Sequence, residues 1–115
     1  MNDNSTIAKL LTNGILDYLL NNKATNIEIK INTESSNLTI YSQSHMLQKP
    51  HNMDQINSSL NSGIDKNIDL YYSELLSSSD RDLSDFTLVS SIVDSGKIEY
   101  DLENKELYIE LVRNL

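Results

Sequence analysis

The fold class is decided by the stretch Lys97-Ile-Glu-Tyr-Asp-Leu-Glu-Asn-Lys-Glu-Leu-Tyr-Ile-Glu-Leu-Val-Arg113. Apolar residues occupy every second position on both sides of a polar turn at 103–105. Strict alternation is typical of a strand with one buried and one exposed face, so the stretch predicts a β-hairpin. Its apolar positions are Ile98, Tyr100, Leu102, Leu107, Ile109 and Leu111.

The positions between these apolar residues carry mostly carboxylates, with one tyrosine among them. An exposed aromatic supplies contact area that solubility alone does not require. We therefore predict a partner-binding surface on this side of the hairpin, although a simple solvated acidic surface fits the same pattern. The candidate residues are Glu99, Asp101, Glu106, Tyr108 and Glu110.

A second hairpin and a helix are predicted in the first 41 residues. Apolar residues at three- and four-residue spacing predict a helix that begins near Asn4 or Ser5 and ends at 21–23, with Gly14 placed to allow close packing. Strands then alternate over 27–32 and 38–41 around a turn at 34–37. Tyr41, like Tyr108, falls on the exposed side of its strand.

The middle of the chain predicts two or three short helices. Residues 42–52 look like a connector that holds both histidines, His45 and His51. Helical spacing follows at 53–60, 68–76 and 84–95, with Gly63 and Gly96 as helix stops.

These elements predict a single α+β domain over residues 1–115, in the order α-β-β-α-α-(α)-β-β. Two hairpins form a four-stranded antiparallel sheet, and four to five helices cover one face in a two-layer arrangement. The predicted core consists of Leu10, Leu11, Ile15, Leu19, Ile27, Ile29, Ile31, Leu38, Ile40, Leu75, Phe86, Val89, Ile92, Ile98, Leu107, Ile109 and Leu111.

The net charge is −8, and the residues after position 53 carry all of it. Such a chain repels phosphate backbones and attracts basic surfaces, so we expect a basic protein partner, and neither direct nucleic-acid nor membrane binding. No stretch reaches the ~18 apolar residues of a membrane span, and the N-terminus lacks a secretory signal, which together predict a cytoplasmic protein. The composition, rich in Asn, Ser, Ile and Lys, is what AT-rich codons produce and is typical of a low-GC bacterium or its phage.

Known catalytic and metal-binding motifs do not occur in this sequence. It contains no glycine-rich phosphate loop, no G-x-G-x-x-G, no G-x-S-x-G and no cysteine. His45 and His51, with Asp54 nearby, match no metal-ligand spacing. The acidic run that begins at Asp80 has Asp85 and Ser91 where a calcium loop needs glycine and glutamate. We therefore predict no cofactor and no metal.

The lack of catalytic motifs favours a non-enzymatic protein-binding or regulatory module of the inhibitor, immunity or adaptor type. One alternative is a small-molecule-binding or enzymatic domain with a pocket between sheet and helices. Another is a self-associating structural protein. A homodimer is expected because the apolar content of 38% implies a thin core, and because a four-stranded sheet has two edges that a second copy can cover.

Overall fold

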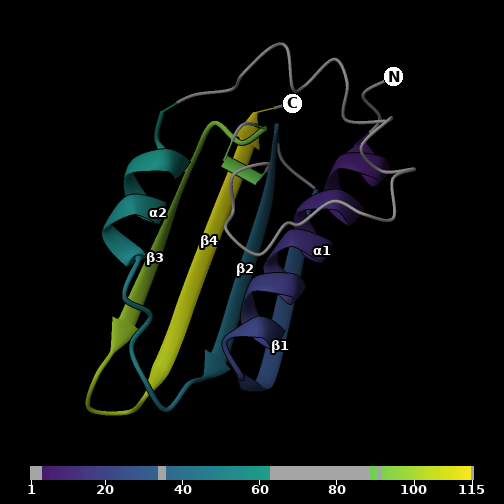
Figure 1. Cartoon of the computed structure of the whole chain (residues 1–115). Coiled ribbons are helices and arrows are strands. Elements are labelled where there is room, and N and C mark those ends of the chain that lie inside the picture. The colour runs from purple at the N-terminus through teal and green to yellow at the C-terminus, as the bar shows by residue number, and fades with distance from the viewer. Residues whose placement is uncertain (1–3, 34–35, 63–88, 91, 115) are drawn as a thin grey trace.

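The computed structural model describes residues 4–33, 36–62, 89–90 and 92–114 (Figure 1). Within these ranges the fold is α+β with a four-stranded antiparallel sheet, as predicted. The elements are α1 (Asn4–Asn21), β1 (Thr25–Asn32), β2 (Asn37–His45), α2 (Met53–Leu60), β3 (Ser95–Asp101) and β4 (Glu106–Asn114). The helix predicted at 68–76 and most of the one predicted at 84–95 lie outside the described residues, as do Leu75 and Phe86.

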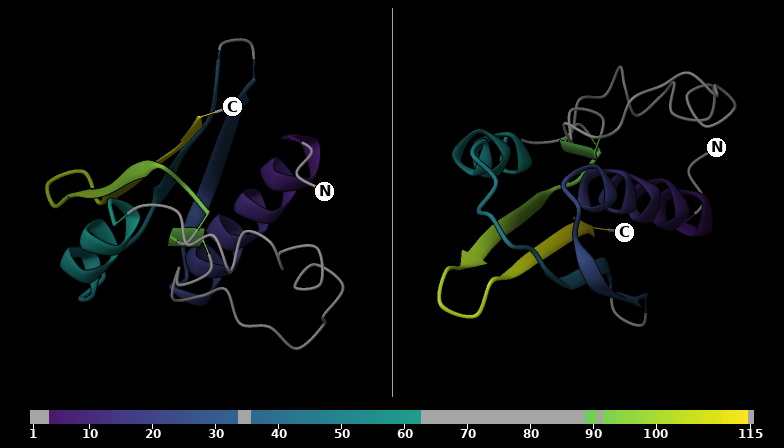
Figure 2. Two further views of the ribbon diagram at one scale, coloured as in Figure 1. Left: turned by 90° about the horizontal axis from the view of Figure 1, so that it is seen from above. Right: turned by 60° about the horizontal axis from the view of Figure 1, so that its bottom comes forward.

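The two hairpins meet through their second strands, which gives the strand order β1-β2-β4-β3. The central pair, β2 and β4, is in register over its whole length, from Asn37 opposite Asn114 to His45 opposite Glu106. The strands β1 and β3 are therefore the two edges of the sheet. Both described helices lie on the same side of it, α1 over β1 and β2 and α2 beside β3 (Figure 2).

The first helix ends where Lys23 adopts a left-handed backbone with φ of 63°. The N–H of Ala24 then donates to the carbonyl of Leu19 across 2.9 Å, which closes the last helical turn. Gly14 permits a close approach, because a Cβ at this position would collide with Cγ2 of Val89. The predicted role of this glycine in close packing is thus confirmed.

The core lies between the sheet and the helices and contains most of the predicted residues. Twelve of them are buried: Leu10, Leu11, Ile15, Leu19, Leu38, Ile40, Val89, Ile92, Ile98, Leu107, Ile109 and Leu111. Ile27 and Ile29 are half-buried against this cluster. The prediction for Ile31 is wrong, since it is 49% exposed at the end of the edge strand β1. Residues that the prediction left out are also buried, including Ile7, Tyr18, Met46, Met53, Ile56, Leu60 and Val93.

Several predicted boundaries are wrong. The strand β2 extends to His45, so residues 42–45 belong to the sheet and not to a connector. Gly96 lies within β3 and stops no helix; a Cβ there would come within 2.7 Å of the carbonyl oxygen of Glu110. Leu102 is part of the β3–β4 turn and is 70% exposed, so it does not continue the apolar alternation of β3.

The helix α2 closes the outer edge of β3 with two asparagine side chains. Asn57 accepts a hydrogen bond from the N–H of Ile98 at 2.9 Å and donates one to the carbonyl of the same residue at 3.0 Å. Asn61 likewise accepts a hydrogen bond from the N–H of Gly96 at 3.4 Å and donates one to the carbonyl of Gly96 at 2.9 Å. Each amide replaces the two backbone groups that a neighbouring strand would offer, so the edge is satisfied without a fifth strand.

Candidate functional site

All five candidate residues lie on the side of the sheet that faces away from the helices. The register places Glu99 opposite Tyr108 and Asp101 opposite Glu106, and it sets Lys97 across from Glu110. Because cross-strand partners point to the same side of a sheet, the alternation predicted from sequence brings these residues together. We call this side the outer face; its central residues are Glu28, Lys30, Tyr41, Gln43, Lys97, Glu99, Asp101, Glu106, Tyr108 and Glu110.

An aromatic pair occupies the centre of the outer face. The rings of Tyr41 and Tyr108 lie with their centroids 6.5 Å apart and their planes inclined by 30°. This separation is within the range of attractive aromatic contacts. Tyr41 comes from β2 and Tyr108 from β4, where Glu110 is the direct neighbour of Tyr41. Both side chains are only partly exposed, so the pair forms a shallow apolar centre that remains accessible to a partner.

Carboxylates lie beside this aromatic pair on β3 and β4, whereas Lys30 lies opposite Tyr41 on β1. Five acidic residues and two lysines lie on the outer face, and the described ion pair joins Lys97 Nζ to Glu99 Oε1 at 3.7 Å. Both of these side chains are well exposed, so the pair adds little stability. The pKa of Tyr108 is raised, first by desolvation and then by the charges of Glu106 and Asp101. The phenol therefore stays protonated at neutral pH and can donate a hydrogen bond.

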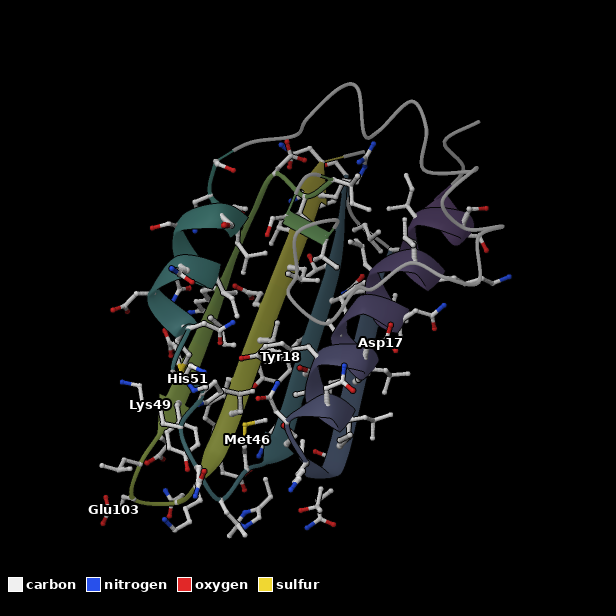
Figure 3. The ribbon with its side chains drawn as sticks, in the orientation of Figure 1. Asp17, Tyr18, Met46, Lys49, His51 and Glu103 are labelled. Atoms are coloured by element: carbon white, nitrogen blue, oxygen red, sulfur yellow. The ribbon has the colours of Figure 1, made fainter. Side chains whose placement is uncertain are left out.

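Asp101 differs from the other four candidates, because its carboxylate is used inside the β3–β4 turn. Oδ1 accepts the N–H groups of Glu103 and Asn104 at 3.0 and 3.2 Å, and Oδ2 accepts Nδ2 of Asn104 at 2.8 Å. These hydrogen bonds, with the Asn104 side chain first, lower the pKa of Asp101. Asp101 contributes charge to the outer face, but its oxygens shape the turn, whose tip carries Glu103 (Figure 3).

The two histidines do not come together. His45 ends β2 opposite Glu106, whereas His51 is exposed before α2. A shallow hollow of about 310 Å³ is lined by Lys49, Pro50, His51, Met53 and Asp54. Figure 3 labels Lys49 and His51 of this lining. Across the described ranges no group of three or more His, Asp or Glu residues is arranged to hold a metal ion. The acidic run at 80–85 lies outside the described residues.

A larger groove of about 810 Å³ lies beside the β1 edge of the sheet, between α1 and the end of β1. Its lining consists of Ser5, Ala8, Lys9, Thr12, Asn13, Ile31 and Thr33. Among these described lining residues only Lys9 is ionisable, and none of them carries a carboxylate or an imidazole. This composition offers no general acid–base pair.

Comparison of the chain with protein-family models, with curated proteins and with solved structures finds no match. None of the described helices is long and apolar enough to cross a membrane.

Proposed function

We propose that this protein is a non-enzymatic binding module that holds a basic protein partner on the outer face of its sheet. The observation that carries the proposal is the Tyr41–Tyr108 pair, partly exposed beside the carboxylates of β3 and β4. Inhibitors, immunity proteins and adaptors act in this way, by presenting a surface without a reaction centre.

The arrangement of charge and aromatic area supports binding over simple solubility. A surface that serves solubility alone needs interspersed charges and no aromatic centre. Here Tyr108 has Glu99 on one neighbouring strand and Gln43 on the other, so apolar contact area lies directly beside a carboxylate. A partner with a lysine or arginine next to an apolar side chain fits this pattern, because a cation can contact both the ring face and a carboxylate.

The backbone beneath the outer face is rigid enough to hold it in shape. The inward side chains of the same two central strands, such as Ile40, Leu107 and Ile109, are fully buried. A preformed surface loses little conformational entropy when it binds. We therefore expect association without refolding of the sheet, and with an on-rate that falls as salt is added.

The test compares two double charge reversals in affinity capture from a native lysate. E106K/E110K changes the outer face, whereas the control D17K/E103K makes the same change in net charge on the exposed surface of α1 and at the turn. Capture of basic proteins should be lost with E106K/E110K and with Y108A, and kept with the control. Equal loss in both double variants would show that net charge alone attracts the partner.

A direct binding measurement completes this test. Backbone amide NMR shifts during titration with a lysine- and arginine-rich peptide should concentrate on β2 and β4, and should shrink as salt is raised. Shifts spread over both helices, or unaffected by Y108A, would contradict a site on the outer face.

A small-molecule-binding role is the second candidate, and the groove between α1 and β1 favours it. Its volume of about 810 Å³ lies in the range of ligand sites. Mass spectrometry of the freshly purified protein under native conditions tests this role. A bound molecule that T12W, inside the groove, displaces would support it, whereas protein without any bound molecule would favour the binding module.

A further inference from the structure

The two edges of the sheet are treated differently. At β3 the backbone groups of Gly96 and Ile98 are satisfied by the side chains of Asn57 and Asn61. At β1 no strand among the described residues pairs with the outer edge, and the helix α1 packs on its face. An unsatisfied strand edge is a template for another strand.

The ladder identifies the backbone groups that β1 turns outward. In antiparallel strands, successive residues direct their N–H and C=O alternately to one neighbour and to the other. The backbone N–H and C=O groups of Gly96 and Ile98 face α2. When the alternation is followed from β3 through β4 and β2 to β1, the residues of β1 that bond to β2 are Glu28, Lys30 and Asn32. The outward residues of β1 are therefore Ile27, Ile29 and Ile31.

We propose that the β1 edge is a homodimer interface, in which β1 pairs antiparallel with β1 of a second copy about a twofold axis at Ile29. The three outward isoleucines exchange their hydrogen bonds in this arrangement: Ile29 with Ile29 of the second copy, and Ile27 with Ile31 of the second copy. The two sheets become one sheet of eight strands. This edge borders the outer face and shares Glu28 and Lys30 with it, whereas the Tyr41–Tyr108 pair lies on the central strands β2 and β4.

Charge selects this register from its neighbours. Outward residues must oppose outward residues, so the register moves only in steps of two. One step in one direction sets Glu28 against Glu28 of the second copy, and one step in the other sets Lys30 against Lys30. The register about Ile29 sets Glu28 against Lys30 twice. Opposite charges directly across two strands attract, and like charges repel.

The apolar surface beside this edge fits a second copy. Ile31 is half-exposed, and it shares the groove with Lys9 and Asn13 of α1. Helical spacing places Leu20 on the same stripe of α1 as Lys9, eleven residues away and three turns further on. Leu20 is 61% exposed. In the proposed dimer the two α1 helices lie side by side on one face of the eight-stranded sheet, where these side chains lose water.

The decisive experiment measures mass by light scattering or sedimentation over a concentration series, for the wild type and five charge variants. At about 100 µM the wild type should approach twice the 13.0 kDa chain mass. Both K30E and E28K should weaken the dimer about 10-fold or more, because each replaces two attractive pairs by two repulsive ones. The swap E28K/K30E should restore it, since the pairs re-form with exchanged partners.

The controls K97E and E99K make the same changes in net charge on the edge that α2 closes, and they should leave the dimer unchanged. E28K lowers the net negative charge, so general repulsion between acidic chains predicts a stronger dimer for this variant, opposite to our expectation. A monomer mass for the wild type at every concentration overturns the proposal. So does a dimer that the single variants leave intact, that the control variants weaken equally, or that the swap does not restore.

Discussion

The closed edge and the open edge of this sheet solve one problem in opposite ways. At β3, two amide side chains take the place of a neighbouring strand. At β1, the five residues from Glu28 to Asn32 present a regular edge, because the bulge in this strand lies before them, between Thr25 and Glu28. Association through one edge closes at two copies, whereas two open edges would permit open-ended growth. The difference teaches that blocking one edge limits the size of an assembly.

The largest expected contrast is in amide hydrogen exchange at low protein concentration. The N–H of Ile98 is bonded to Asn57 and that of Ile29 points outward from β1, so the Ile98 amide should exchange about 100-fold or more slowly. At high concentration the Ile29 amide should become protected as well. Exchange resolved by NMR measures both. Similar rates for the two amides in dilute protein would abolish the distinction between the edges.

Truncation of matched isoleucines should also separate the two edges. Ile98 is 1% exposed on β3 and Ile31 is 49% exposed on β1. I98A should lower the free energy of unfolding by about 3 kcal/mol, whereas I31A should cost less than about 1 kcal/mol. Urea unfolding of the dilute protein gives both values. Equal losses would mean that β1 is as well covered as β3.

Opening the closed edge should change both stability and assembly. N57A/N61A removes four hydrogen bonds from β3, and since water replaces part of each one we expect a loss of about 2 kcal/mol. Sedimentation should then show species larger than a dimer, because each chain has two open edges. S58A/S59A, on the exposed side of the same helix, is the control. A N57A/N61A variant that keeps the mass of the wild type would show that the asparagines do not limit association.

The smallest effect concerns the turn that ends the closed edge. Asp101 has a lowered pKa in the folded protein, so its carboxylate adds stability above the ordinary value of 3.8, and this stability is lost as pH falls through the folded pKa. D101N should therefore be less stable than the wild type at neutral pH, and the gap should narrow in acid. Urea unfolding at several pH values measures this, with E103Q as the control in the same turn. A gap that stays constant in acid would contradict the assignment.

Periodicity predicted the parts of this fold that depend on neighbours in the chain. Alternation assigned Ile98, Ile109 and Leu111 to the buried side and Glu99 and Glu110 to the outer face. Alternation specifies a side of the sheet, but it does not tell whether a helix reaches that side. Ile31 obeys the pattern and is nevertheless half-exposed, since its strand is an edge and a groove separates it from α1.

The missed features depend on contacts between distant segments. Ser42 and Ser44 are completely buried in β2, yet small polar residues give no hydrophobic signal, and so the strand was predicted to end early. The Tyr41–Tyr108 contact requires that β2 adjoins β4, which neither hairpin specifies. Asn57 and Asn61 look like ordinary exposed residues of a helix. The turn role of Asp101 had a local signal, an asparagine three residues later.

The asparagine contacts between α2 and β3 also set a limit on how long an edge a helix can close. Four residues of a helix advance about 6.0 Å, and two residues of a strand advance about 6.6–6.8 Å. The two repeats therefore drift apart by about 0.6–0.8 Å at each step, and a hydrogen bond tolerates only one or two such steps. The next position in the helical repeat is Met53, which is buried and apolar. The helical and strand spacings therefore agree closely enough for hydrogen bonding only over about two helical turns, which is the length of α2.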